Sequence, residues 1–307
     1  VMISGIGAVV GSLVLASLPN RYRGVMLVVS SLIMGIALTV FSFSTTFTVS
    51  ALAIIFVGIG QTEFSKNSGR SEMQLACEAV AAALADAGID PAEVDGLCTY
   101  THDANTEMEV FRNIGGRELH FWNRLHYGGG AACGVVLQAA LAVAGGVADV
   151  VVCYRAMNER SEYRFGQGHI PQAQGRATYE QAHWSFVTTS GLFTPASWVG
   201  MQARRYMHQY GATSEDFGRA TVISRQHAAR NPAAWFYNRP ITLEDHQASR
   251  MIADPLRMLD CCQESDGGVA LVIVSAERAR DLRHRPALIR AAAQGVVPNQ
   301  EEMTEFQ

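Results

Sequence analysis

The residues between 126 and 133 combine types that can bind and attack a carbonyl group. His126 precedes Gly128-Gly129-Gly130, and Cys133 begins a run of small and apolar residues that predicts a helix over 133–144. A glycine turn at a helix N-terminus can present backbone N–H groups to an oxyanion, and the same position lowers the pKa of a thiol. The structural alternatives are a tight loop, a packed cysteine and a hydrogen-bonding histidine.

Composition argues against several other kinds of site. The six cysteines include no CxxC pair, and no Cys/His spacing predicts a zinc site, so we expect no metal. Adjacent Cys261 and Cys262, and cysteines within apolar runs, favour reduced thiols in the cytosol. Beyond residue 62 the chain has 22 basic and 28 acidic residues, which gives no basic excess to attract nucleic acid.

The distribution of charge divides the chain near residue 60. Residues 1–62 carry two charged side chains, Arg21 and Arg23, which lie between the uncharged apolar runs 2–18 and 25–43. Each run approaches the length of about 20 residues that crosses a bilayer. The pattern predicts a transmembrane helical hairpin over 1–52, with its arginine loop facing the cytoplasm. The alternative is a pair of helices buried in a soluble core.

This N-terminal pattern of two small-residue-rich spans and a short arginine loop resembles part of a major facilitator superfamily transporter. The resemblance covers about a fifth of the chain and implies a membrane-embedded fragment that cannot transport by itself. Residues 53–307 are expected to form a separate, cytoplasmic domain, so the break near residue 60 would join two unrelated proteins.

The residues after the break predict an α/β domain, because apolar strands alternate with capped helices. Ser71 and Gly88 have the residue types expected at the two ends of the first helix. Asp266-Gly267-Gly268 is expected to form a turn that leads into a strand. The expected strands are 53–60, 96–100, 147–154, 268–275 and 286–292, and the expected helices are 71–87, 133–144, 198–210, 215–230, 242–251 and 276–282.

Four segments occur in the order that is typical of the thiolase-like superfamily. They are 57–64, 85–90, 127–149 and 254–268. The last segment, together with 206–211 and 227–232, is similar to the branch that contains sterol-carrier-protein thiolases and lipid-transfer-protein aldolases. The resemblance extends from about residue 54 to the end of the sequence.

The resemblance implies the first half of a thiolase-like layered αβαβα fold, followed by the loop region between the halves. The second half would begin near residue 295, and its His motif and second Cys are not in this sequence, so we expect these 307 residues to be inactive alone. The resemblance also implies a homodimer, an accompanying OB-fold and zinc-ribbon subunit, and an acyl-CoA substrate. Coenzyme A would be part of that substrate rather than a bound cofactor.

The sequence departs from the thiolase pattern at the nucleophile. The family spacing places the reactive Cys 17 residues before Gly146, where this chain has Gly129. This loss favours the aldolase members of the branch, which cleave a carbon–carbon bond beside a CoA thioester, as in steroid side-chain degradation. That reaction needs a general base and enolate stabilisation but no acyl-enzyme. Cys133, four residues later, is either a small packed residue, which we favour, or a displaced nucleophile.

The leading hypothesis is therefore retro-aldol cleavage of a lipid or steroid side-chain CoA thioester. The alternatives are acyl transfer of the acetyl-CoA acetyltransferase type, and a non-catalytic lipid or acyl-CoA binder or transporter fragment. In the leading hypothesis Gly128–Gly130 bind the thioester oxygen and His126 lines the pocket. Segment 190–196 resembles the substrate-facing loop of the branch, which makes Ser190 and Gly191 candidate binding residues, or else it is an ordinary surface loop.

Overall fold

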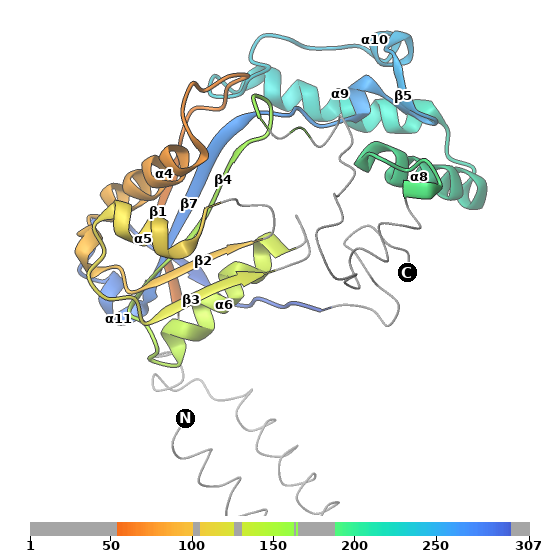
Figure 1. Cartoon of the computed structure of the whole chain (residues 1–307). Coiled ribbons are helices and arrows are strands. Elements are labelled where there is room, and N and C mark those ends of the chain that lie inside the picture. The colour runs from red at the N-terminus through yellow and green to blue at the C-terminus, as the bar shows by residue number, and fades with distance from the viewer. Residues whose placement is uncertain (1–53, 101–104, 126–130, 163, 165–187, 296–307) are drawn as a thin grey trace, which may run out of the picture.

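The computed structural model describes residues 54–100, 105–125, 131–162, 164 and 188–295 (Figure 1). The predicted hairpin over 1–52, His126 and Gly128–Gly130 lie outside these residues. Within the described residues, no helix is both long enough and apolar enough to cross a membrane.

A six-stranded mixed sheet forms the centre of the described chain. The strand order is β3-β2-β4-β7-β1-β8. Strand β2 pairs in parallel with both β3 and β4, whereas β7 runs antiparallel to β4 and β1, and β8 runs antiparallel to β1. The strands are β1 (Ile54–Gln61), β2 (Gly96–Tyr100), β3 (Phe121–Leu125), β4 (Val150–Asn158), β7 (Asp266–Ser275) and β8 (Ala287–Ile289).

Helices cover both faces of this sheet. Helices α4 (Glu72–Ala87) and α5 (Glu107–Ile114) pack on one face, and α6 (Ala132–Ala144) packs on the other. Side chains alternate along β4 accordingly. Val150, Val152 and Tyr154 join the core under α4, while Val151 and Cys153 join the core under α6. The α/β prediction is confirmed, although β3 and α5 were not predicted.

Helix α4 has the ends that the sequence predicts. The Ser71 hydroxyl accepts a hydrogen bond from the Gln74 N–H, and Gly88 ends the helix in the left-handed conformation at φ 73°. Its buried alanines lie against β1, where the strand carries glycine. A Cβ at Gly60 would overlap the backbone of Ala79 and Ala83, so this close approach requires glycine.

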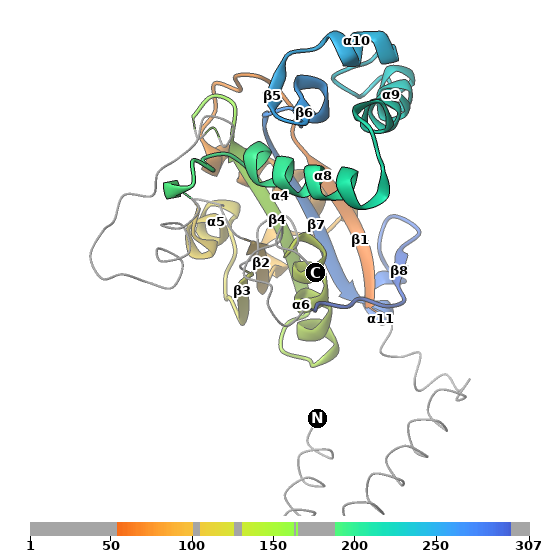
Figure 2. The same cartoon turned by 90° about the vertical axis from the view of Figure 1, so that its right-hand side faces the viewer.

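A second group of elements, here called the helical region (194–260), lies at the end of the sheet toward which β4 runs (Figures 1 and 2). Helix α9 packs on α10 and η4, and α8 packs on β5 and β6. His246 is fully buried, and its Nε2 lies 2.7 Å from Oδ1 of Asp260. The elements are α8 (Pro195–Tyr210), α9 (Ser214–Arg230), α10 (Leu243–Ala248), β5 (Met251–Ala253), β6 (Leu256–Arg257) and η4 (Met258–Asp260).

Two predicted boundaries were wrong for identifiable reasons. Strand β4 begins at Val150 rather than at 147, because the Asp95 carboxylate accepts hydrogen bonds from the N–H groups of Asp149 and Val150 and fixes the chain there. Helix α10 ends at Ala248 rather than at 251, and Met251 instead pairs with Arg257 in the β5–β6 ladder. The remaining short elements are η1 (Pro91–Glu93) and α11 (Ala276–Ala279).

The expectation of a turn at Asp266-Gly267-Gly268 was also wrong, since these residues begin β7. Asp266 pairs with Asn158 of β4 and is fully buried. Its carboxylate accepts hydrogen bonds from the backbone N–H groups of Ser68 at 2.9 Å and of Arg160 and Ser161 at 3.0 Å each. Burial alone raises the pKa of Asp266, but bonds from the Ser161 hydroxyl and these N–H groups outweigh burial and lower the pKa below its usual value.

The contact between α4 and β1 predicts the effect of adding one methyl group. Gly60→Ala should lower the free energy of unfolding by about 2–3 kcal/mol, because the backbone of α4 must move to admit the Cβ. Urea unfolding measures this difference. Gly295→Ala is the control, since no atom lies within 4 Å of a Cβ at this exposed position. Equal stability of the two variants would contradict the close approach.

The Asp266 site predicts a pH-dependent stability. Because the folded pKa is lowered, the contribution of the carboxylate is present above the unfolded value of about 3.9 and is lost as the pH falls through the folded pKa. Asp266→Asn should cost about 2–4 kcal/mol at pH 7, since buried N–H donors lose an anionic acceptor. The difference in the free energy of unfolding between this variant and wild type should become smaller below about pH 4. Asp281→Asn, at an exposed position, is the control. A stability difference between Asp266→Asn and wild type that stays constant with pH would contradict an ionised Asp266 carboxylate.

Candidate active site

The carboxyl ends of three parallel strands meet at one edge of the sheet. Tyr100 of β2 is in register with Leu125 of β3, and Cys98 of β2 is in register with Cys153 of β4. Ligands of open α/β sheets bind outside the carboxyl ends of such strands. The predicted glycine turn begins three residues after Leu125 in sequence, so this edge is the candidate site.

Helix α6 begins at the same edge. It connects β3 to β4, which run in the same direction, so the helix must return antiparallel to both strands. Along the helix, the Cys153 thiol lies 3.6 Å from the Val135 carbonyl oxygen. Arg155 lies about 6.6 Å further along β4, a rise that takes about four helical residues. Arg155 is therefore level with Ala131, immediately before the first turn of α6.

Arg155 places a cation at this edge. Its Nη1 donates to the Tyr100 carbonyl oxygen at 2.8 Å, and its guanidinium carbon lies 4.6 Å from the centroid of the Tyr100 ring. Nη2 lies 2.8 Å from the sulfur of Met157. A guanidinium keeps its proton in proteins, and the aromatic face holds it in place. The group is suited to binding an anion or an oxygen that gains negative charge.

A carboxyl group with a raised pKa lies just beyond β4. Half-buried Glu159 has its pKa raised by burial and by the nearby charge of Glu264, while Arg155 and Lys66 act in the opposite direction. Glu264 itself is bound by Arg164, whose Nε lies 2.7 Å from Oε2, and its carbonyl oxygen accepts from Lys66 Nζ at 2.7 Å. A raised pKa brings the Glu159 carboxyl closer to the range useful in proton transfer.

The candidate nucleophile is not a packed residue, contrary to the interpretation favoured from sequence. Cys133 is exposed in the first turn of α6. The preference for burial failed because position 133 lies on the side of the helix that faces away from Val135 and Ala139, which pack on the sheet. Its exposure leaves the displaced-nucleophile interpretation open.

The other predicted binding residues lie in a different part of the fold. Ser190 and Gly191 are exposed in a turn that precedes α8. Gly191 adopts φ 77°, and its N–H donates to the Thr188 carbonyl oxygen at 3.0 Å. Thr194 then caps α8 through a reciprocal pair of hydrogen bonds with Ser197. Their role in binding stays a prediction.

The remaining thiols lack the environment of a nucleophile. All six cysteines are free, and Cys98 and Cys153 are buried side by side under α6. A hydrogen bond from Cys98 and burial raise the pKa of the Cys153 thiol well above its usual value. Burial also raises the pKa of Cys262, together with the charge of Glu159. Among the described residues, no group of three His, Cys, Asp or Glu side chains could hold a metal ion.

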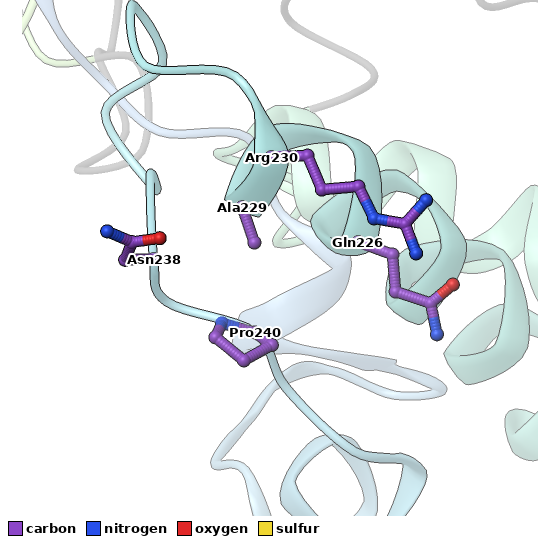
Figure 3. A pocket seen from close by; sticks show the side chains of 5 residues that line it. All are labelled: Gln226, Ala229, Arg230, Asn238 and Pro240. Carbon is purple, nitrogen blue, oxygen red and sulfur yellow. The ribbon is translucent and has the colours of Figure 1, made fainter.

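A pocket of about 440 Å³ lies in the helical region, between α9 and the loop that follows it. Figure 3 shows Gln226, Ala229 and Arg230 of α9 opposite Asn238 and Pro240 of the following loop. The loop is held by a hydrogen bond from the Asn238 N–H to the Ala229 carbonyl oxygen at 3.0 Å. Two amides and one guanidinium can recognise polar groups, but these five side chains include no group that exchanges protons near neutral pH.

Sequence reasoning did not identify Arg155 and Tyr100 as a contacting pair at this edge of the sheet. The available signal was a charged residue at the end of an apolar strand, because Arg155 interrupts the buried run of β4. An arginine at such a position needs a partner or a function, since long charged side chains are seldom buried without one. The pairing with Tyr100 depends on strand order, which the sequence alone does not state.

Known proteins include relatives of high identity to this chain. No family model matches the chain. The chain is 63% identical over 254 residues to a steroid side-chain-cleaving aldolase of Thermomonospora curvata, covering 83% of this chain and 65% of the relative. It is 60% identical over 250 residues to 17-hydroxy-3-oxo-4-pregnene-20-carboxyl-CoA lyase of Mycobacterium tuberculosis, covering 81% and 64%. The chain thus spans slightly less than two thirds of each relative.

Solved structures give the same picture for the fold. An Ltp2-ChsH2(DUF35) aldolase matches with a TM-score of 0.75 and 62% identity over 82% of this chain and 63% of that one. A monomeric SCP2-thiolase like protein from Mycobacterium smegmatis matches with a TM-score of 0.57 and 24% identity over 76% of this chain and 48% of that one, which supports the fold alone. The described part of this chain therefore has the thiolase-like fold, and steroid side-chain aldolases are its relatives at high identity.

Proposed function

We propose that the protein to which this chain belongs cleaves a steroid side-chain CoA thioester by a retro-aldol reaction. The observation that carries the proposal is the identity of 63% and 60% to an aldolase and a CoA lyase whose names specify this chemistry. The chain covers most of its own length in both matches but only about two thirds of each relative. The activity is therefore proposed for the whole protein.

The chemistry sets two requirements for the site. A base removes the proton of the β-hydroxyl group, the electron pair of that O–H bond forms a carbonyl, and the bond between Cα and Cβ breaks. The released pair becomes an enolate of the CoA thioester, which then takes up a proton at Cα. The step needs a proton acceptor and stabilisation of the enolate oxygen, and it needs no covalent bond to the protein. The position of Gly129 in place of the thiolase nucleophile agrees with this.

Acyl transfer is the second candidate, and one observation favours it. Cys133 is exposed in the first turn of α6, where a substrate can reach its thiol. The same position would suit an acyl-enzyme intermediate. The two candidates differ in whether a covalent adduct forms on Cys133, which provides the test.

The proposal extends to partners. The related solved aldolase contains a second subunit, named there as ChsH2(DUF35), and we expect a corresponding subunit here in the place of the predicted OB-fold and zinc-ribbon partner. A homodimer and binding of acyl-CoA in the cytoplasm remain part of the proposal, with coenzyme A as part of the substrate. The transporter-like hairpin over 1–52 also remains a prediction.

Cys133→Ser distinguishes the two candidate functions. In the full-length protein, this variant should release the carbonyl product from 17-hydroxy-3-oxo-4-pregnene-20-carboxyl-CoA within about threefold of the wild-type rate, because retro-aldol cleavage uses no acyl-cysteine. Product formation is followed by chromatography, and intact-mass spectrometry of the quenched protein should show no acyl adduct.

Cys77→Ser is the matched control, since Cys77 lies on the outer part of α4, on the opposite face of the sheet from α6. An acyl adduct on Cys133, with activity lost in Cys133→Ser and kept in Cys77→Ser, would replace the aldolase proposal with acyl transfer.

A further inference from the structure

The pocket between α9 and the loop that follows it is lined by polar side chains that the proposed reaction does not use. Its volume of about 440 Å³ falls within the range of about 300–1,000 Å³ that is typical of sites for small ligands. Gln226 and Arg230 are one helical turn apart on α9, so their side chains extend from the same side of the helix (Figure 3). Asn238 and Pro240 form the opposite wall.

The chain around this pocket is rich in arginine and lacks acidic residues. Residues 217–243 include four arginines and no Asp or Glu. One of them, Arg219, is ion-paired with acidic residues in the first turn of α9. The other three, Arg225, Arg230 and Arg239, form no ion pair within the part of the chain that the structure describes. Positive charge therefore gathers at the C-terminal half of α9 and in the following loop.

Arg225 holds the loop that forms the second wall. Its guanidinium carbon lies 3.5 Å from the centroid of the Phe236 ring, and its Nη1 donates to the Arg239 carbonyl oxygen at 3.4 Å. The Asn238 N–H donates to a carbonyl oxygen of α9, and Asn238 has a left-handed φ of 55°, which asparagine tolerates. These contacts hold the loop against α9, so the two walls of the pocket keep a defined separation.

Arg230 is the cation that lines the pocket itself. Its side chain is exposed and makes no hydrogen bond, ion pair or ring contact with the described residues. The planar fork of its N–H donors matches a phosphate group, which a guanidinium can bind through two parallel hydrogen bonds. Gln226 and Asn238 each add the N–H donors of a carboxamide. One guanidinium and two carboxamides, with no carboxylate among the lining side chains, favour an anion that has several acceptor oxygens.

We propose that this pocket binds the phosphate group of a small organic phosphate. Arg230 binds the phosphate oxygens, and Gln226 and Asn238 donate to the other acceptors of the ligand. The pocket is larger than a phosphate ion, so the phosphate belongs to a larger molecule such as a nucleotide. The C-terminal end of α9 carries about half a negative charge, which three nearby guanidinium groups outweigh. The inference does not depend on the proposed function, because binding requires no reaction.

The test uses adenosine 5′-diphosphate and adenosine as probes, in isothermal titration calorimetry with the full-length protein. The diphosphate should bind at least about tenfold more tightly than adenosine, because the two differ only in the charged phosphates. Arg230→Gln should weaken binding of the diphosphate by about tenfold or more, since it removes the charge and the bidentate contact. Arg230→Lys should weaken binding by about threefold, because it keeps the charge without the fork of donors.

Arg219→Gln is the matched control, because it removes the same charge from α9 at a position that acidic side chains already bind. It should change the affinity for the diphosphate by less than about twofold. Three results would each overturn the proposal. They are no saturable binding of the diphosphate to the wild-type protein, equal affinity for the diphosphate and adenosine, and equal effects of Arg219→Gln and Arg230→Gln.

Competition with coenzyme A identifies the source of the phosphate. If coenzyme A displaces the diphosphate, the pocket binds the nucleotide end of the acyl-CoA, and Arg230→Gln should raise the KM of that substrate while kcat stays unchanged. If coenzyme A does not displace it, the pocket binds a separate nucleotide. Both outcomes support the phosphate site. The binding measurements need no turnover, so a failure of the aldolase proposal would leave this test intact.

Discussion

The parallel pairing of β2 with β3 and β4 is the constraint on which the site depends. Parallel strands bring their carboxyl ends to one edge, and they force the connecting helix α6 to return in the opposite direction. These two consequences place the start of α6 beside Tyr100 and Arg155, although the three segments are far apart in sequence. An antiparallel arrangement would send the helix start and the two side chains to opposite edges.

The antiparallel strand β7 holds in place the chain segments that lie beyond this edge of the sheet. It runs between β4 and β1 and begins with Asp266, whose buried carboxylate binds backbone N–H groups from two other segments. One of these segments is the turn after β4, which carries Glu159. The other is the loop that leads from β1 into α4, so the same anion links the segments that follow β1 and β4, the two neighbours of β7. The glycine of β1 under α4 completes the contact, because it lets the helix lie directly on the strand.

Local signals in the sequence predicted most single elements but not how they combine. Ser71 and Gly88 fixed the ends of α4 because capping depends on residues close in sequence. Strand β3 was missed because its five residues are only partly buried and show no clear alternation. Asp266 was read as a turn residue because Asp-Gly-Gly favours turns, whereas its real partners lie about 100 and 200 residues away. Such long-range hydrogen bonds leave no local pattern.

The candidate site shows the same division between local and long-range information. The motif at 128–133 predicts a site at the carboxyl ends of the parallel strands, and the glycine at 129 argues against acyl-enzyme chemistry. The motif could not show that Arg155 of β4 contacts Tyr100 of β2 at this edge, because that contact depends on strand order. A thiolase forms a covalent bond that carries the acyl group, but an aldolase must stabilise an enolate by electrostatics alone. The spacing that places Gly129 at the thiolase nucleophile position is read from residues close in sequence, whereas the groups that surround the strand ends depend on how distant strands pair.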